Sequence, residues 1–355
     1  MQIVRPIAWR RGGPGAALAL LLFAATNPGC SCDDGHADDG PPTSSSGAGG
    51  DGGGSTADIG KATAVASEKT PFDATPDPDG NRIYFTAYDP AAGESGAAGV
   101  FTVAADGGDI DEVFVGAPLV SPFGIAISND GKQLYVADAA AENETSTDED
   151  DRGQIFALSP EGGTPTPLSG TTGYAPRGLE VTGEGGGDIV FSGHDPESGE
   201  GGVFKVSSGG GGVSALFVGE PLSDPSGVAI TADGAKVFVA DTRGSGSGKA
   251  AIFLITSGDA QEFLMEIDVG FPAGVALSKD DSTLFVSGLD PNTLTDVVLV
   301  VDVASKEVST YTGDDDTDFS QFEEPAGLHR AKNADVFAWA DSKANENGTV
   351  YVIGK

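Results

Sequence analysis

A short sequence motif recurs six times along this chain. Its clearest copy is Ser121–Asp138, SPFGIAISNDGKQLYVAD, which contains a Pro-x-Gly entry, an apolar run, an Asn-Asp-Gly-Lys turn and a second apolar run ending in Asp. The other copies are Thr70–Asp89, Ala175–Asp195, Asp224–Asp241, Phe271–Asp290 and Glu324–Asp341. A unit that repeats nearly to the end of a 355-residue chain predicts one large repeat domain, not several unrelated domains.

The spacing of the repeats indicates the architecture. Successive repeat prolines are 51, 54, 49, 47 and 53 residues apart, a period typical of a propeller blade and too long for leucine-rich or ankyrin units. Each unit contains four short apolar runs, and the Asn-Asp-Gly-Lys turn between the first two is a hairpin signal. Abundant glycine (54) and proline (21) suit short strands joined by turns. We therefore predict an all-β fold over residues 61–355: a six-bladed β-propeller with four antiparallel strands per blade.

The two ends of the repeat region are complementary. After Asp341 only one strand-like run remains, Thr349–Ile353, so the sixth blade lacks its outermost strand. A spare strand, Lys61–Ser67, precedes the first blade. We expect this N-terminal strand to complete the last blade and close the ring.

The first 60 residues have the character of an export signal and a tether. Residues 1–29 combine three arginines with a short apolar core, which is typical of a signal peptide. Asn-Pro-Gly-Cys at 27–30 resembles a bacterial lipobox, in which Cys30 would be lipidated; the alternative is an ordinary secretory signal. Residues 30–60 are rich in Gly, Ser and Asp and predict a disordered tether. Because Ser31 follows Cys30, the lipoprotein resemblance implies the outer membrane of the cell envelope more than the inner.

Composition excludes several classes of function. The chain has 19 basic and 54 acidic residues and a net charge of −35, which disfavours nucleic acid and anionic lipid headgroups as partners. The acidity suits cations, a basic protein partner, or solubility alone. Both cysteines, Cys30 and Cys32, precede the repeats, so the propeller has no disulfide, thiolate metal site or cysteine nucleophile. We expect a monomer.

The repeat PxGVAxxxDGxxVFVAD resembles the six-bladed propellers of the NHL and gluconolactonase-like group. That resemblance implies sites at the channel mouth where innermost strands begin. The candidates there are the residues that follow repeat prolines: Phe72, Phe123, Arg177 and Ser226. The metal-binding Pro-Asn-Gly of gluconolactonases is replaced here by Pro122-Phe123-Gly124, and Lys69-Thr70-Pro71 stands where their Glu-Gly-Pro would fall, so their ligands do not carry over.

Six aspartates end the repeat motifs: Asp89, Asp138, Asp195, Asp241, Asp290 and Asp341. They could form a carboxylate ring for a hard cation such as Ca²⁺, or each could cap its own turn through backbone N–H groups. Repetition in every blade favours turn capping. The loop Ala139–Arg152 is densely acidic without EF-hand spacing, which predicts a solvated segment.

Two histidines fall within the repeats. His194 ends a second strand of the third blade near Arg177, and His329 lies in the innermost strand of the sixth. These three residues are the only visible catalytic candidates, and structural roles for both histidines are favoured because no catalytic partner is marked. The sequence thus favours an exported, lipid-anchored binding or scaffolding module at the cell envelope, with a basic protein or envelope polysaccharide as partner. The alternative is a lactonase-like hydrolase or lyase.

Overall fold

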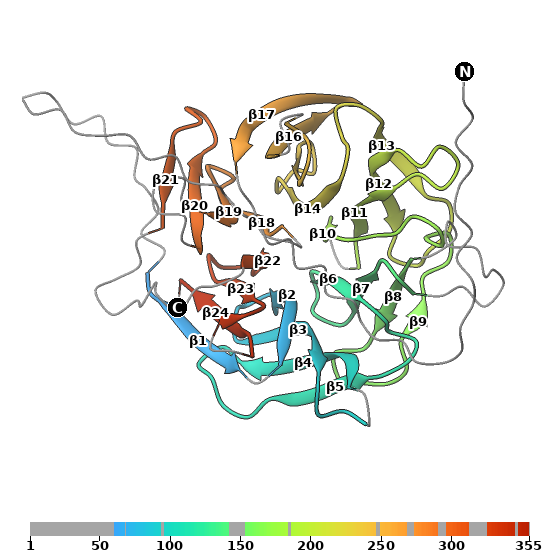
Figure 1. The fold of residues 1–355 in the computed structure, drawn as a ribbon, viewed down its shortest axis with the longest axis vertical. Coiled ribbons are helices and arrows are strands. Elements are labelled where there is room, and N and C mark those ends of the chain that lie inside the picture. The colour runs from blue at the N-terminus through green and yellow to red at the C-terminus, as the bar shows by residue number, and fades with distance from the viewer. Residues whose placement is uncertain are drawn as a thin grey trace, which may run out of the picture. The chain divides into compact units, whose positions relative to one another are not determined.

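The computed structural model describes residues 60–354, with gaps at 68, 94–95, 142–152, 184–185, 246–248, 268–272, 290–295, 312–324 and 345–346. These residues form six four-stranded antiparallel sheets, and no α-helix occurs among them. The six sheets are arranged radially as the blades of a propeller, and the first strand of each sequence motif is the innermost strand of its blade (Figure 1). The predicted fold class is confirmed. In the described part of the chain, no helix is long and apolar enough to cross a membrane.

Blades are numbered in chain order, and their strands are given from the innermost outward. Blade 1 contains β2 (Thr70–Pro76), β3 (Arg82–Asp89), β4 (Ala97–Ala104) and β5 (Asp111–Val115). Blade 2 contains β6 (Pro122–Ile127), β7 (Leu134–Asp138), β8 (Gln154–Leu158) and β9 (Thr166–Pro167). Blade 3 contains β10 (Leu179–Thr182), β11 (Asp188–His194), β12 (Gly201–Ser207) and β13 (Ser214–Val218).

The second half repeats this order. Blade 4 contains β14 (Pro225–Ile230), β15 (Val237–Asp241), β16 (Ala250–Thr256) and β17 (Asp259–Ile267). Blade 5 contains β18 (Val275–Leu277), β19 (Thr283–Leu289), β20 (Asp296–Asp302) and β21 (Val308–Thr310). Blade 6 contains β22 (Pro325–Arg330), β23 (Phe337–Asp341), β24 (Thr349–Ile353) and β1 (Ala62–Ser67).

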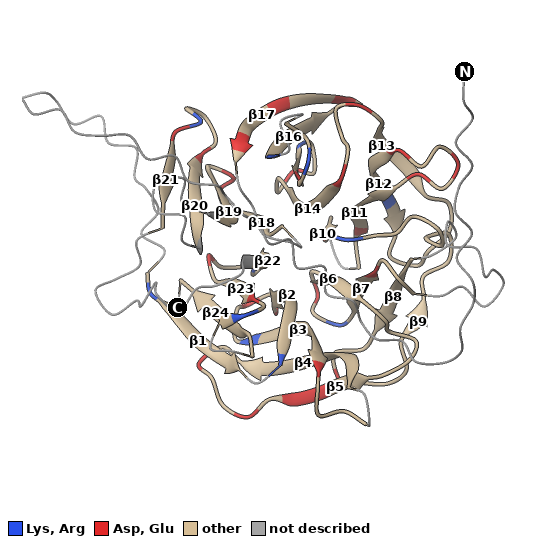
Figure 2. Ribbon diagram, viewed as in Figure 1, with Lys and Arg blue, Asp and Glu red and all other residues tan. Residues whose placement is uncertain are grey.

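Hydrophobic packing lies between the blades. The buried side chains form six clusters in the described region, and each cluster joins the facing sheets of two neighbouring blades. Trp339 is fully buried between blades 5 and 6, with its ring centroid 5.5 Å from that of Tyr351. Outermost strands such as β5 and β17 carry acidic residues (Figure 2), which discourage pairing of these exposed edges with other chains.

The innermost strands approach one another so closely that they need glycine. The glycines of the Pro-x-Gly motifs face the backbone of the next blade, and a Cβ at Gly124, Gly178, Gly227 or Gly274 would lie closer than 3 Å to a carbonyl oxygen of that blade. Atoms of a real side chain cannot adopt such distances, so the repeat keeps glycine there. Blade 1 is the exception, because Asp73 occupies this position.

The ring is closed by β1, as the sequence predicts. β1 pairs antiparallel with β24, from Ala62 opposite Ile353 to Ser67 opposite Thr349. Val65 and Ala66 are buried in the cluster between blades 6 and 1. The N-terminal strand thereby joins the last blade to the first.

We expect deletion of residues 60–68 to lower the free energy of unfolding by roughly several kcal/mol, since it removes a row of ladder bonds and buried apolar surface. Urea unfolding of the full chain and the deletion variant would measure this. Deletion of the equally long segment 43–51 in the predicted tether serves as the control. Equal stability of the two deletions would contradict closure by β1.

Candidate functional site

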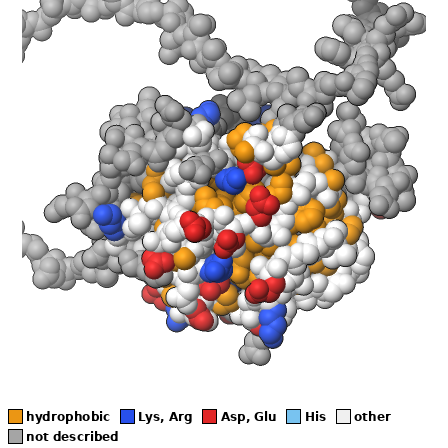
Figure 3. Space-filling view, turned by 90° about the horizontal axis from the view of Figure 1, so that it is seen from below, with side chains coloured by type: hydrophobic (Ala, Val, Ile, Leu, Met, Phe, Trp, Pro, Cys, Tyr) orange, Lys and Arg blue, Asp and Glu red, His pale blue; other side chains and the backbone are white. Residues whose placement is uncertain are grey.

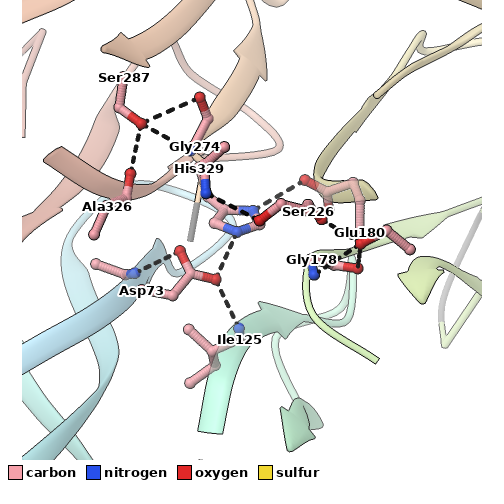
Figure 4. Close-up of polar contacts among 12 residues, drawn as sticks. Asp73, Ile125, Gly178, Glu180, Ser226, Gly274, Ser287, Ala326 and His329 are labelled. Carbon is pink, nitrogen blue, oxygen red and sulfur yellow. Dashed lines mark hydrogen bonds and ion pairs between the residues drawn. The ribbon is translucent and has the colours of Figure 1, made fainter. Parts of the chain in front are cut away.

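A cluster of charged side chains lies on the propeller axis (Figure 4). His329, from β22 of blade 6, is 5% exposed. Its Nε2 lies 3.0 Å from Oδ2 of Asp73 in blade 1, and its Nδ1 lies 3.4 Å from Oε2 of Glu180 in blade 3. Lys332, which follows β22, contacts the other carboxylate oxygen of Glu180. We call these four residues the axial cluster.

Asp73 joins three blades. Its Oδ2 accepts hydrogen bonds from His329 of blade 6 and from the backbone N–H of Ile125 in blade 2, at 2.8 Å, while Oδ1 accepts from the N–H of Ala74. A Cβ at Gly327 would collide with this carboxylate, so Gly327 makes room for it. The departure of blade 1 from Pro-x-Gly therefore introduces a polar connection across the axis.

The axial cluster is compensated in charge. Both ring nitrogens of His329 face carboxylate oxygens, and the ring can donate from both only when it is protonated. Burial by itself lowers the pKa of His329, but the carboxylates of Asp73 and Glu180 outweigh it and raise this pKa to about 10. For Glu180 the signs are reversed. Burial by itself raises the pKa of this carboxyl group, but the positive charges of Lys332 and His329 outweigh burial and lower the pKa to about 2. Two cations thus face two carboxylates at neutral pH.

The sequence analysis named His329 but missed the other three residues of the axial cluster: Asp73, Glu180 and Lys332. Asp73 and Glu180, like His329, interrupt positions that most other repeats keep small or apolar: Asp73 replaces the motif glycine, while Glu180 and His329 occupy the position of Ala126 in GIAI. Comparison of the six copies column by column, with attention to charged exceptions, could have found them.

The other sequence candidates lie nearer the opposite end of the innermost strands. His194 ends β11, where burial and the nearby Arg177 lower its pKa. Arg177 forms an ion pair with Asp224 of blade 4, and this pairing lowers the pKa of Asp224 although burial opposes it. His194 and Arg177 are therefore brought together, as the sequence predicts, but Asp224 engages the guanidinium. His329 belongs to the axial cluster instead.

The remaining post-proline residues have packing roles. Phe72 and Phe123 form an edge-to-face pair with ring centroids 5.5 Å apart. Ser226 is fully buried, and its hydroxyl accepts the N–H of Ala273 in blade 5. Nearby, Ser287 donates to the carbonyl of Ala326 at 2.6 Å and accepts from Gly274, which ties blade 5 to blade 6 (Figure 4).

The terminal aspartates bond to backbone N–H groups near their turns. Asp138 accepts from Val120, Ser121 and Ala140, and Asp241 accepts from Ser223, Asp224 and Arg243. Similar bonds are made by Asp89, Asp195 and Asp341. Among the described residues, no group of three or more His, Cys, Asp or Glu side chains could hold a metal ion. Asp290, Cys30 and residues 142–152 lie outside the described residues.

A cavity of about 250 Å³ opens at one end of the channel, where innermost strands pass into their hairpin turns. We call it the hairpin pocket. Its lining comes from blades 2 to 6 and includes Glu180, Arg330 and Lys332 together with the aliphatic Ile230 and Leu277. The pocket lies at the opposite end from the predicted mouth. Deeper along the axis, a small cavity of about 10 Å³ lies beside Asp73 and His329.

Comparisons with known proteins identify the fold alone. No protein-family model and no curated protein sequence matches this chain. Similar solved structures include the PQQ-bound aldose sugar dehydrogenase from Streptomyces coelicolor, with a TM-score of 0.56 and 12% identity, covering 83% of this chain and 98% of that chain. A second is an auxiliary nutrient binding protein from Bacteroides thetaiotaomicron, with a TM-score of 0.54 and 14% identity, covering 81% of this chain and 69% of that chain. A third is a gluconolactonase from Xanthomonas campestris, with a TM-score of 0.51 and 16% identity, covering 82% of this chain and 96% of that chain.

The axial cluster predicts a characteristic dependence of stability on pH. His329 has a folded pKa far above its unfolded value of about 6.5, so its contribution is fully present below pH 6.5 and is lost as pH rises towards 10. Glu180 has the opposite sign, and its contribution is lost as pH falls from about 4.5 towards 2. We therefore expect the stability difference between wild type and His329→Gln to be larger at pH 6 than at pH 10.

Urea unfolding of both proteins at several pH values would measure this difference, and ring ¹⁵N shifts would report the protonation of His329 directly. Asp79→Asn, at an exposed turn, is the control and should leave the profile unchanged. An imidazole that loses its proton below pH 7 in the folded protein would contradict the assignment.

We also expect that millimolar Ca²⁺ leaves the melting temperature at its value in EDTA, since the terminal aspartates already accept backbone N–H bonds. Calcium at about one hundred times its dissociation constant would add about 2.7 kcal/mol to the stability, which a thermal melt detects. A shift of that size would restore the carboxylate-ring hypothesis.

Proposed function

We propose that this chain is an exported, lipid-anchored propeller that acts as a binding module at the cell envelope, with its ligand site in the hairpin pocket. The observation that carries this proposal is the axial cluster. A protonated imidazole held between two carboxylates cannot accept a proton from a substrate, so the most central histidine is unsuited to act as a general base.

The surrounding residues support binding without turnover. His194 has no carboxylate within hydrogen-bonding distance among the described contacts, and the guanidinium of Arg177 is paired with Asp224. The hairpin pocket combines charged and polar groups with aliphatic side chains, a composition suited to holding a small polar molecule. The lactonase-like alternative therefore lacks a residue in the described region with the geometry of an activated base.

The leader supports the cellular location. An apolar core followed by Asn-Pro-Gly-Cys and a Gly/Ser-rich tether suits lipidation at Cys30, with export to the outer membrane favoured by Ser31. A flexible tether would let the propeller reach envelope polysaccharide or a basic protein. Charged side chains of both signs lie among apolar ones on the face in Figure 3, so this face is not a single-sign electrostatic surface.

The proposal can be tested by expressing the wild-type chain and the Cys30→Ala variant in a bacterial host. The mass, detergent partitioning and lactone hydrolysis of the two proteins are then compared. We expect the wild type to carry a lipid-sized mass increase and to partition into detergent, whereas Cys30→Ala should do neither. Neither protein should hydrolyse aldonolactones above the buffer rate, with or without Ca²⁺. A water-soluble wild type would overturn the anchoring, and lactone turnover that survives purification would overturn the binding role.

A further inference from the structure

We propose that the hairpin pocket binds a small hydroxylated monocarboxylate, namely a sugar acid, with its carboxylate facing Arg330 and Lys332. This inference rests on the proposed function and specifies its ligand class. The sugar acid could be free or could form the end of an acidic glycan, because both present the same carboxylate and hydroxyl groups.

Arg330 is a fixed guanidinium at the pocket wall. Its Nε donates to the carbonyl of Leu277 at 2.7 Å, and its Nη1 donates to the carbonyls of Ala331, Lys332 and Ala334. These bonds fix the plane of the group, whereas Nη2 has no partner among the described residues. A guanidinium held in this way can donate to a ligand with little further loss of side-chain entropy.

No carboxylate in the described region pairs directly with Arg330. Glu180 lines the same pocket, but its oxygens already accept from Lys332, from His329 and from the N–H of Val181 at 2.8 Å. Burial lowers the pKa of Arg330, and four carboxylates oppose this from beyond ion-pair distance: Glu180, Asp335, Asp281 and Asp280. A ligand carboxylate could therefore supply the direct ion pair that no described residue gives this guanidinium, whose partners among the described contacts are all carbonyl oxygens.

The rest of the lining suits the carbon skeleton of a sugar acid. Ile230 and Leu277 provide aliphatic surface for C–H groups, while Thr182 and Asn129 provide polar atoms for hydroxyls. The volume of about 250 Å³ lies below the range for drug-sized ligands and suits a molecule of monosaccharide size. A second cavity of about 400 Å³ between blades 3 and 4 shares Thr182, Gly183 and Ile230 with this pocket, which leaves room for a further sugar unit.

Calorimetric titration of the full chain with galacturonate and with galactose tests the charge requirement, because the two sugars differ only at the C6 group. We expect galacturonate to bind at least about tenfold more tightly, the effect of one partly solvated charge interaction. Digalacturonate distinguishes the sources: tighter binding than the monomer indicates a glycan end, and equal binding indicates a free sugar acid.

Variants at the rim locate the site without disturbing the axial cluster. Ala232 is exposed and lines the pocket, so Ala232→Glu should fold normally and weaken galacturonate binding about tenfold through charge repulsion. Ala232→Gln matches its size without charge, and Ala235→Glu places the same charge on the same hairpin outside the pocket lining. Both should bind galacturonate as the wild type does, and Arg330→Gln should abolish binding.

Three results would overturn the inference: equal affinity for galactose and galacturonate, no galacturonate binding at millimolar concentration, or binding that Ala232→Glu leaves unchanged. If galactose and galacturonate bind equally well and Ala232→Trp abolishes the binding of both by filling the pocket, the sugar-acid inference fails but the proposed binding role stands. Hydrolysis of a lactone by the same preparation would overturn the proposed function itself. Melting temperatures within a few degrees of wild type confirm that each rim variant is folded.

Discussion

The close approach of the innermost strands is the constraint on which this propeller depends. Neighbouring strands meet around the axis at distances that leave no room for a Cβ at Gly124, Gly178, Gly227 or Gly274. The Pro-x-Gly signature is therefore a steric requirement that radial packing imposes on five of the six blades. It explains why the motif recurs and why its loss in blade 1 has consequences for the whole ring.

Asp73 turns that exception into a connection between blades. Its carboxylate reaches blade 2 through the N–H of Ile125 and blade 6 through His329, and His329 extends the link to Glu180 of blade 3. Buried charges are costly unless each has partners, so the four side chains of the axial cluster depend on one another. Beside this network the described residues leave a cavity of about 10 Å³, whereas the hairpin pocket measures about 250 Å³.

The sequence predicted the fold well because the fold is a consequence of repetition. The motif period, the NDGK turn and the spare strand before blade 1 each have a local physical meaning, and β1 pairs with β24 as expected. The axial cluster was harder to predict, since Asp73, Glu180 and His329 are far apart in the chain and meet only when the ring closes. In the sequence these residues appear only as charged exceptions to the repeat consensus, and a single exception in one repeat gives little indication of a site.

The location of the pocket illustrates the same limit. Family resemblance directed attention to the ends where innermost strands begin, whereas the cavity lined by Arg330 and Lys332 lies where they finish. Position within a fold does not fix chemistry, because each site depends on which blades depart from the repeat. Here Glu180 lies in the innermost strand of blade 3, and His329, Arg330 and Lys332 lie at or just beyond the end of the innermost strand of blade 6. These two blades stand opposite each other in a six-membered ring, so their joint departure from the consensus spans the channel and places Arg330 at its mouth.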